Sequence, residues 1–258
     1  MPFQERSLKT EAIVLRHSDM GEADRLLTLF SRDAGILRAV AKGVRRIHSH
    51  KAGHLEPFTR VNLMLARSHD LWIVTQAVAV DLYLPLHEDL VLTSEAAYVL
   101  ELIDRFSYED GENRILYQLL VQTLERLAKG DPIFTAVHFF ELHLLDAVGF
   151  RPQLFQCVRC KEEIHPQNQF FSAVEGGAVC PRCGSLVPDA RPVSTAALKY
   201  LRNFQRTAYP RLLQADPSSP VEKEVENILQ YYNTCLLERR LNTPQFINEV
   251  RKTLPQVN

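Results

Sequence analysis

Two Cys-x-x-Cys pairs lie close together in the second half of the chain, Cys157 with Cys160 and Cys180 with Cys183. The 19 residues between the pairs are typical of sites in which four cysteine thiolates hold one zinc ion. Each pair can form a tight turn that directs two sulfur atoms toward one point. Because four thiolates fill a tetrahedral zinc ion, no position remains for water or substrate. We therefore expect one structural Zn²⁺ per chain, which stabilises a segment with little core of its own.

Three other interpretations of these side chains remain open. Either Cys-x-x-Cys pair could carry out thiol redox chemistry, which is the alternative to a zinc site. His165 lies between the pairs and could replace one cysteine as a ligand. Cys235, the fifth cysteine, falls on the apolar side of an expected helix and is interpreted as a core residue.

A second group of residues could bind a polyanion. From Ala34 to Leu55 the chain has no Asp or Glu. A cluster of cations on a small barrel can neutralise a phosphodiester backbone, whereas many charge runs are only solvated surface. Aromatic residues for base stacking are few in this half, mainly Phe30, Phe58 and Trp72, which favours contacts to the backbone over base readout. The residues expected to contact nucleic acid are Arg38, Lys42, Arg45, Arg46 and Lys51.

The composition indicates a globular protein with an uneven charge distribution. The chain has 258 residues, of which 46% are hydrophobic and 24% charged. Residues 1–80 hold 12 Lys/Arg and 8 Asp/Glu (net +4), residues 81–150 hold 4 and 13 (net −9), and residues 151–258 hold 14 and 10 (net +4). No apolar run approaches the length of a membrane span, and the N-terminus lacks an apolar signal core. We expect a cytoplasmic protein without a membrane partner.

The first 80 residues should form a small β-barrel that positions the basic stretch. Short apolar runs separated by polar turns predict five strands, near residues 11–16, 25–30, 36–43, 60–66 and 71–80. Val61, Leu63 and Leu65 alternate with polar or flexible side chains, as in a half-buried strand. The pattern does not distinguish an OB-fold from an SH3-like barrel.

From about residue 86 the hydrophobic period becomes helical. Helices are expected over residues 94–107, 114–129, 132–148 and 219–240, and Gly130 is expected to end the second of them. The predicted N-caps are Ser94, Asp131 and Ser219.

Most of the sequence, the last ~50 residues least distinctively, resembles the RecO family of recombination mediators. The resemblance lies in "KTEAIVLRHSDMGEADRLLTLFSRDAGILRAVAKGVRR" with "GHLEPF", in "HFFELHLLDAVGFRPQLFQCVRC", and in "FFSAVEGGAVCPRC". It implies a bacterial, nucleoid-associated protein that binds single- and double-stranded DNA and anneals complementary strands. It also implies RecR and the C-terminal tail of the single-strand binding protein as partners, and an indirect role in loading RecA in the RecF pathway.

The expected fold is a multidomain α+β protein. It has a five-stranded OB-fold (residues 1–82), a helical domain in two parts (83–154 and 189–258), and an inserted zinc segment (155–188). The implied partner tail is acidic with an apolar end, so its groove should combine cations with an apolar side chain and is placed at Arg202, Phe204 and Arg206. No catalytic motif such as a phosphate-binding glycine loop is present, so we expect a protein that is not an enzyme. The alternative is a zinc-ribbon adaptor whose barrel binds protein or RNA.

Overall fold

The computed structural model describes residues 7–68, 71–107, 113–214 and 217–253. Its contacts divide the chain into two compact units. Unit 1 comprises Met1–Lys129 and Glu249–Asn258, and unit 2 comprises Gly130–Asn248. The finer division at residues 82, 154 and 188 stays a prediction. None of the described helices is long and apolar enough to cross a membrane.

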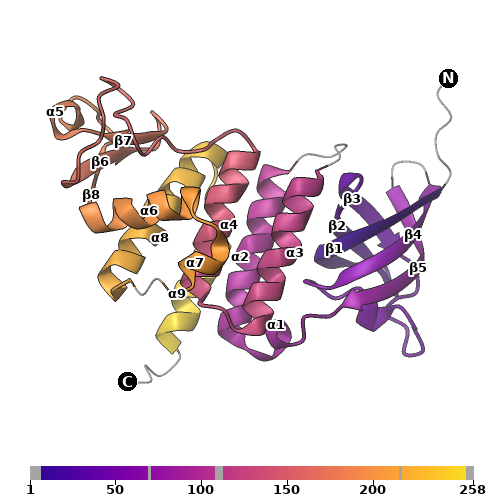
Figure 1. Ribbon diagram of the computed structural model, residues 1–258. Coiled ribbons are helices and arrows are strands. Elements are labelled where there is room, and N and C mark those ends of the chain that lie inside the picture. Colours follow the sequence, from indigo (N-terminus) through magenta and orange to yellow (C-terminus); the bar gives the residue numbers. More distant parts are fainter. Residues whose placement is uncertain (1–6, 69–70, 108–112, 215–216, 254–258) are drawn as a thin grey trace, which may run out of the picture. The chain divides into compact units, whose positions relative to one another are not determined.

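Unit 1 contains a closed barrel with the strand order β1-β2-β3-β5-β4, drawn in indigo and purple in Figure 1. Neighbouring strands are antiparallel except β3 and β5, which pair in parallel. This is the five-stranded arrangement of an OB-fold, so the predicted fold class is confirmed. The strands are β1 (Ser7–Met20), β2 (Asp24–Ser31), β3 (Gly35–Ala41), β4 (Arg60–Ser68) and β5 (Leu71–Asp81).

Alternating side chains fill the barrel, as the sequence predicts. On β4, Val61, Leu63 and Leu65 are buried in the core, whereas Asn62 and Met64 are exposed. A period of two places one set of side chains inside and the other outside. The predicted hairpin of β4 and β5 is also present, although residues 69–70 of its turn lie outside the described residues.

Three α-helices of unit 1 follow the barrel in the sequence, and the end of a fourth, α9 (Thr243–Thr253), also belongs to this unit. The three are α1 (Pro85–Glu88), α2 (Leu90–Phe106) and α3 (Arg114–Lys129). The Tyr117 hydroxyl of α3 donates a hydrogen bond to the Glu11 carboxylate of β1 (3.1 Å), which also binds the Arg60 guanidinium (2.9 Å). Gly130, with φ +83°, follows the last residue of α3, as predicted.

Unit 2 combines packed helices with a small sheet. Its elements are α4 (Ile133–Ala147), β6 (Gln169–Ser172), β7 (Gly177–Val179), α5 (Pro181–Gly184), β8 (Arg191–Val193), α6 (Thr195–Arg206), α7 (Tyr209–Leu212) and α8 (Ser219–Leu237), and α9 (Thr243–Thr253) begins in unit 2 and ends in unit 1. Helices α4, α6 and α8 lie against one another, and the sheet has the order β7-β6-β8 (Figure 1). Glu141 is buried in α4, where its carboxylate binds His138 (2.5 Å) and Asn233 of α8 (2.9 Å). His138 is thus a packed residue.

All three predicted N-caps are wrong. Helix α2 begins before Ser94, because the Asp89 carboxylate accepts hydrogen bonds from the backbone N–H groups of Val91 (2.7 Å) and Leu92 (3.0 Å). Asp131 does not cap α4, since its carboxylate accepts a hydrogen bond from the Tyr209 hydroxyl (2.9 Å). Helix α8 is shifted by one residue and has Ser218, not Ser219, at its N-cap position, without a side-chain cap.

A close backbone approach fixes β7 in unit 2. Gln153 bonds to Gly176 and Ala178 through backbone groups, and a Cβ atom on Gly177 would lie 2.2 Å from the Gln153 carbonyl oxygen. Only glycine leaves space for this contact. At Gly53 in unit 1, by contrast, an added Cβ meets no atom within 4 Å and the φ angle is ordinary.

We therefore expect the Gly177→Ala substitution to destabilise the protein by about 1–3 kcal/mol or more, because the backbone must shift. Gly53→Ala, the matched control, should change stability little. Urea unfolding of both variants measures the difference. Equal midpoints for Gly177→Ala and Gly53→Ala would contradict the close approach of Gln153 to β7.

Candidate metal centre and candidate nucleic-acid interface

The four paired cysteines come together in unit 2. The sulfur atoms of Cys157, Cys160, Cys180 and Cys183 all lie within 4.8 Å of one another. The Sγ atoms of Cys160 and Cys180 are 3.7 Å apart. A tetrahedral metal with metal–sulfur bonds of about 2.3 Å needs sulfur atoms about 3.8 Å apart. The cluster therefore fits one metal ion.

Local backbone turns present the sulfurs to this point. After Cys157 the chain turns tightly: the Lys161 N–H donates to the Cys157 carbonyl (2.9 Å), and Lys161 adopts a left-handed conformation with φ +63°. Cys180 precedes the short helix α5, which places Cys183 one turn later. Helix α5 ends at Gly184. Only glycine fits at this position, because a Cβ atom there would lie 2.4 Å from the Phe170 ring.

The electrostatics of the cluster call for a cation. Burial opposes ionisation of the Cys157 thiol, but backbone N–H groups directed at its sulfur, first that of Cys180, lower its pKa to about 6. The pKa of Cys183 is instead raised to about 12 by its hydrogen bond with Cys180 and by burial. The four thiols cannot all ionise side by side without a positive charge among them. A divalent ion bound among the sulfurs would supply that charge, and four sulfur ligands would leave no position for water.

The five predicted DNA contacts do not form a single cluster. Lys42, Arg45 and Arg46 share the turn that follows β3, whereas Lys51 precedes a short 3₁₀ helix (Ala52–His54) farther along the same loop. Arg38 lies on β3, on the face opposite the core-directed Leu37 and Ala39, and is exposed. The structure therefore brings three of the five residues together. We call residues 42–59, which connect β3 to β4, the basic loop.

The turn that carries three of these cations is tied to the β1–β2 connection. The Gly43 N–H donates to the Asp24 carboxylate (2.7 Å), and the Arg45 N–H donates to the Ala23 carbonyl (2.9 Å). Lys42 and Arg46 are exposed, and neither side chain has an ion-pair partner within the described ranges. These two cations are accessible to a polyanion without the breaking of an existing pair.

Arg45 differs because an acidic residue already holds it. Its guanidinium lies 3.2 Å from Asp19, whose other oxygen is 3.7 Å from Arg25. The Glu56 carboxylate in turn lies 2.8 Å from the Arg25 guanidinium and 3.1 Å from Nε2 of His17. Burial opposes ionisation of the Glu56 carboxyl, but Arg25 and His17 together lower its pKa. A phosphate must compete with Asp19 for Arg45.

The sequence interpretation missed this ionic network. Asp19 and Arg25 are register partners on β1 and β2, so a correct hairpin register could have indicated their contact. Glu56 follows 25 residues after β2 ends, and no local pattern indicates its role.

The far end of the basic loop contacts β5. The Lys51 ammonium donates to the Val74 carbonyl (3.3 Å), and the Ala79 N–H donates to Nδ1 of His54 (3.3 Å). Nearby, Trp72 is half-buried, with the Arg67 guanidinium 5.0 Å from its ring centre. Phe30 and Phe58 are both buried, so of the three predicted stacking aromatics only Trp72 reaches the surface.

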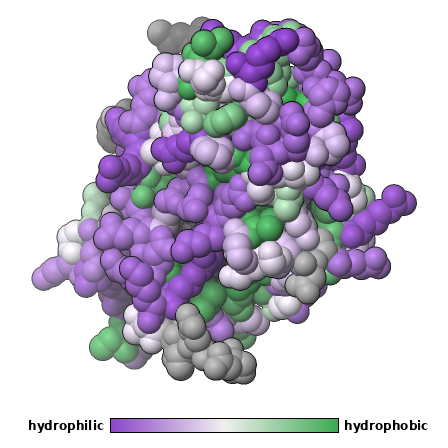
Figure 2. Space-filling model, turned by 90° about the vertical axis from the view of Figure 1, so that its left-hand side faces the viewer, coloured by the Kyte–Doolittle hydropathy of each residue, from purple (hydrophilic) through white to green (hydrophobic). Residues whose placement is uncertain are grey.

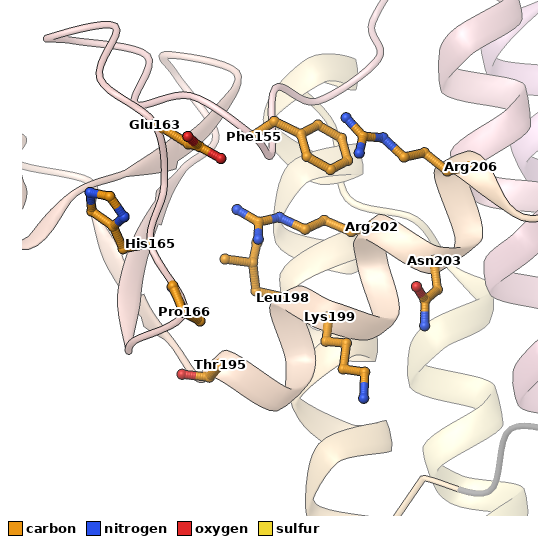
Figure 3. A pocket seen from close by; sticks show the side chains of 10 residues that line it. All are labelled: Phe155, Glu163, His165, Pro166, Thr195, Leu198, Lys199, Arg202, Asn203 and Arg206. Atoms are coloured by element: carbon orange, nitrogen blue, oxygen red, sulfur yellow. The ribbon is translucent and has the colours of Figure 1, made fainter.

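The predicted partner residues lie on α6 of unit 2. Arg202 and Arg206 line a pocket between α6 and the metal-binding segment (Figure 3). Phe204 is fully buried against Phe134, with ring centres 5.6 Å apart, and its side chain has no accessible surface. It contributes to the core of unit 2.

Comparisons with known proteins place the chain in a family. The family model described as "Recombination protein O N terminal" matches residues 6–83, and "Recombination protein O C terminal" matches residues 87–245. A protein of Roseiflexus sp. (strain RS-1) named "DNA repair protein RecO" is 40% identical over 252 residues, which cover 98% of this chain and 89% of that protein.

Two further relatives carry the same name. One, from Desulforudis audaxviator (strain MP104C), is 36% identical over 246 residues, or 95% of this chain and 98% of the relative. Another, from Dehalococcoides mccartyi (strain ATCC BAA-2266 / KCTC 15142 / 195), is 33% identical over 231 residues, or 90% and 91%. Because both family models match and these relatives are similar over nearly their whole length, the chain belongs to the RecO family of DNA repair proteins.

Proposed function

We propose that this protein is a non-enzymatic mediator of DNA repair and homologous recombination in the RecF pathway. It binds single- and double-stranded DNA through Arg38 and the basic loop and anneals complementary strands. The observation that carries this proposal is the pair Lys42 and Arg46, two exposed cations without ion-pair partners among the described residues, on a turn fastened to an OB-fold barrel. Family membership supports the same conclusion.

The proposed mechanism is electrostatic. Two strands that anneal repel each other through their phosphates, and bound cations reduce this repulsion while releasing counterions to the solvent. Because Trp72 is the one accessible candidate for stacking named above, base contacts contribute little and binding tolerates any sequence. On family membership we also propose that the protein acts in the cytoplasm, together with the chromosomal DNA.

We further propose that the metal is one structural Zn²⁺ per chain, held by Cys157, Cys160, Cys180 and Cys183. A set of four thiolates suits zinc, and a closed shell excludes substrate. Zinc supplies folding energy to the segment between α4 and α6, where short strands bury few large side chains.

The protein partners are proposed on family membership alone. They are RecR, the C-terminal tail of the single-strand binding protein, and RecA indirectly, which the protein helps to load onto coated strands. No surface of the described residues is assigned to RecR.

We expect the double variant Lys42→Ala/Arg46→Ala to bind single-stranded DNA more weakly and with a shallower salt dependence. The slope of log K against log salt should fall by about 1.4, since each phosphate contact with a single strand contributes about 0.7. Fluorescence anisotropy with a labelled oligonucleotide measures both quantities. The control Arg114→Ala/Lys129→Ala removes two exposed cations from α3, with the same change in net charge.

Two outcomes contradict this assignment. If the loop variant and the α3 control bind DNA equally, the basic loop is not the contact surface. If the unmodified protein binds DNA weakly and without salt dependence, the chain is instead an adaptor whose barrel binds another protein or RNA.

Asp19→Asn should strengthen DNA binding. The substitution removes the carboxylate that holds Arg45, adds one net positive charge to the site, and leaves Arg25 bound to Glu56. We expect a severalfold gain in affinity at low salt and a steeper salt dependence, measured by the same anisotropy titration. A loss of affinity would show that Asp19 positions Arg45 for the phosphate instead of competing with it.

Cys157→Ser should release the metal and lower the stability of unit 2, while DNA binding by the basic loop persists. Cys235→Ser is the matched control, since Cys235 lies outside the cluster. Elemental analysis of the purified proteins should find about one zinc per chain in the control and much less in Cys157→Ser. A metal-free native protein whose four thiols react rapidly with an alkylating agent would instead indicate a thiol oxidoreductase.

A further inference from the structure

A pocket of about 410 Å³ lies within unit 2, between α6 and the loop that follows the first cysteine pair. Three cations of α6 line it, Lys199, Arg202 and Arg206, at intervals of three and four residues that place them on one helix face. Phe155, Glu163 and the His165–Pro166 turn form the opposite wall (Figure 3). The face of the molecule turned toward the viewer in Figure 2 consists mostly of hydrophilic residues, with hydrophobic ones scattered among them.

Backbone groups hold the two arginines in place. Arg202 donates from Nε to the Leu154 carbonyl (2.9 Å) and from Nη2 to the Ile164 carbonyl (3.3 Å). The Arg206 guanidinium lies over the Phe155 ring, 3.3 Å from its centre, as Figure 3 shows. Since a guanidinium has five N–H donors, Arg202 retains donors for a ligand. Both cations are positioned before any ligand binds, which limits the entropy lost on binding.

The charge of the pocket is unbalanced. Within the described parts of the chain, none of its three cations forms an ion pair. Burial and the neighbouring Arg206 lower the pKa of Arg202, and Glu163 opposes this shift only in part. Two like charges held together in a partly buried site favour the binding of an anion between them.

The shape of the charge pattern favours a nucleic-acid strand over the end of an acidic peptide. Lys199, Arg202 and Arg206 are spread over about two turns of helix, which suits successive phosphates better than one terminal carboxylate. The Phe155–Arg206 stack presents a planar cation on which a base can stack. More of the exposed pocket lining is apolar than polar, but Leu198 is only 2% exposed and the Arg206 guanidinium already lies over the Phe155 ring.

We propose that this pocket is a second binding site for single-stranded nucleic acid, with phosphates at Lys199 and Arg202 and a base stacked on Arg206, which itself lies over Phe155. The site differs from the basic loop in its residues and lies in the other unit. Its biological role rests on the proposed annealing function, in which one molecule must hold two strands.

The test uses Lys199→Glu/Asn203→Asp in the full chain. Both side chains are exposed and line the pocket, and neither has an interaction partner among the described residues, so the fold should be retained. The control Arg211→Glu/Gln214→Glu changes the net charge equally at exposed positions outside the pocket lining. Unfolding temperature and zinc content verify that both variants are folded.

Each pair of substitutions is introduced into the unmodified protein and into Lys42→Ala/Arg46→Ala. Anisotropy with a labelled oligo-dT strand should show about tenfold weaker binding for the pocket variant than for its control in both backgrounds. Annealing of two complementary oligonucleotides should slow by a similar factor. A conservative Arg206→Lys variant should lose part of the affinity, because an ammonium stacks poorly on a base.

Three outcomes separate the hypotheses. If the pocket variant binds oligo-dT as the control does, the second site is wrong. If it instead loses binding of a labelled peptide of four aspartates ending in phenylalanine, while oligo-dT binding is unchanged, the pocket is a peptide groove and the proposal is overturned. If the pocket variant binds oligo-dT more weakly than its control while Lys42→Ala/Arg46→Ala binds it as the unmodified protein does, the pocket proposal stands. The assignment of DNA contacts to the basic loop then fails.

Discussion

The barrel of unit 1 closes where β3 meets β5, through a parallel pairing of only two residue pairs, Ala39 with Trp72 and Val40 with Ile73. The position of the DNA contacts proposed for this unit depends on this short parallel pairing of β3 with β5. Because β3 ends at Ala41 and pairs with β5 and not with β4, the chain must cross the barrel end before β4 begins at Arg60. The crossing segment is the basic loop. Its first turn is tied to the β1–β2 connection through Gly43 and Arg45, so the cations of this turn are held in place by the same strands that form the core.

In unit 2, the cysteine-containing segment between α4 and α6 has only a small apolar core. The strands β6, β7 and β8 have four, three and three residues, and a sheet of this size is marginal without further support. In the role proposed for the cysteine cluster, four thiolates around one ion add the support that this small sheet needs. Arg202 then links the segment to α6 through the carbonyls of Leu154 and Ile164, on both sides of the first cysteine pair. The segment that carries the metal cluster therefore also forms one wall of the pocket, and Arg202 holds this wall against α6.

Local patterns in the sequence predicted much of this, and long-range pairing explains what they missed. The alternation of Val61, Leu63 and Leu65 predicted β4, and cysteine spacing predicted the metal cluster, because both depend on neighbours along the chain. The N-cap prediction at Asp131 failed because the competing partner is not local: Tyr209 binds Asp131 from 78 residues away. Arg45 looked available in the sequence, yet Asp19 of another strand holds it. Phe204 looked like a surface residue beside two arginines, but the packing of α6 against α4 buries it.

The contacts of Lys51 and His54 with β5 have a consequence for association between molecules. Beyond Ile73, where the pairing with β3 ends, two backbone groups of β5 bond to these side chains, the Val74 carbonyl to Lys51 and the Ala79 N–H to His54. An uncovered strand edge is a template for pairing with another chain, and natural proteins often protect such edges with charged side chains. The basic loop thus shields the rim of the barrel from self-association. A polyanion that draws Lys51 away would uncover part of this edge, and the barrel would then be open to strand addition only while its ligand is bound.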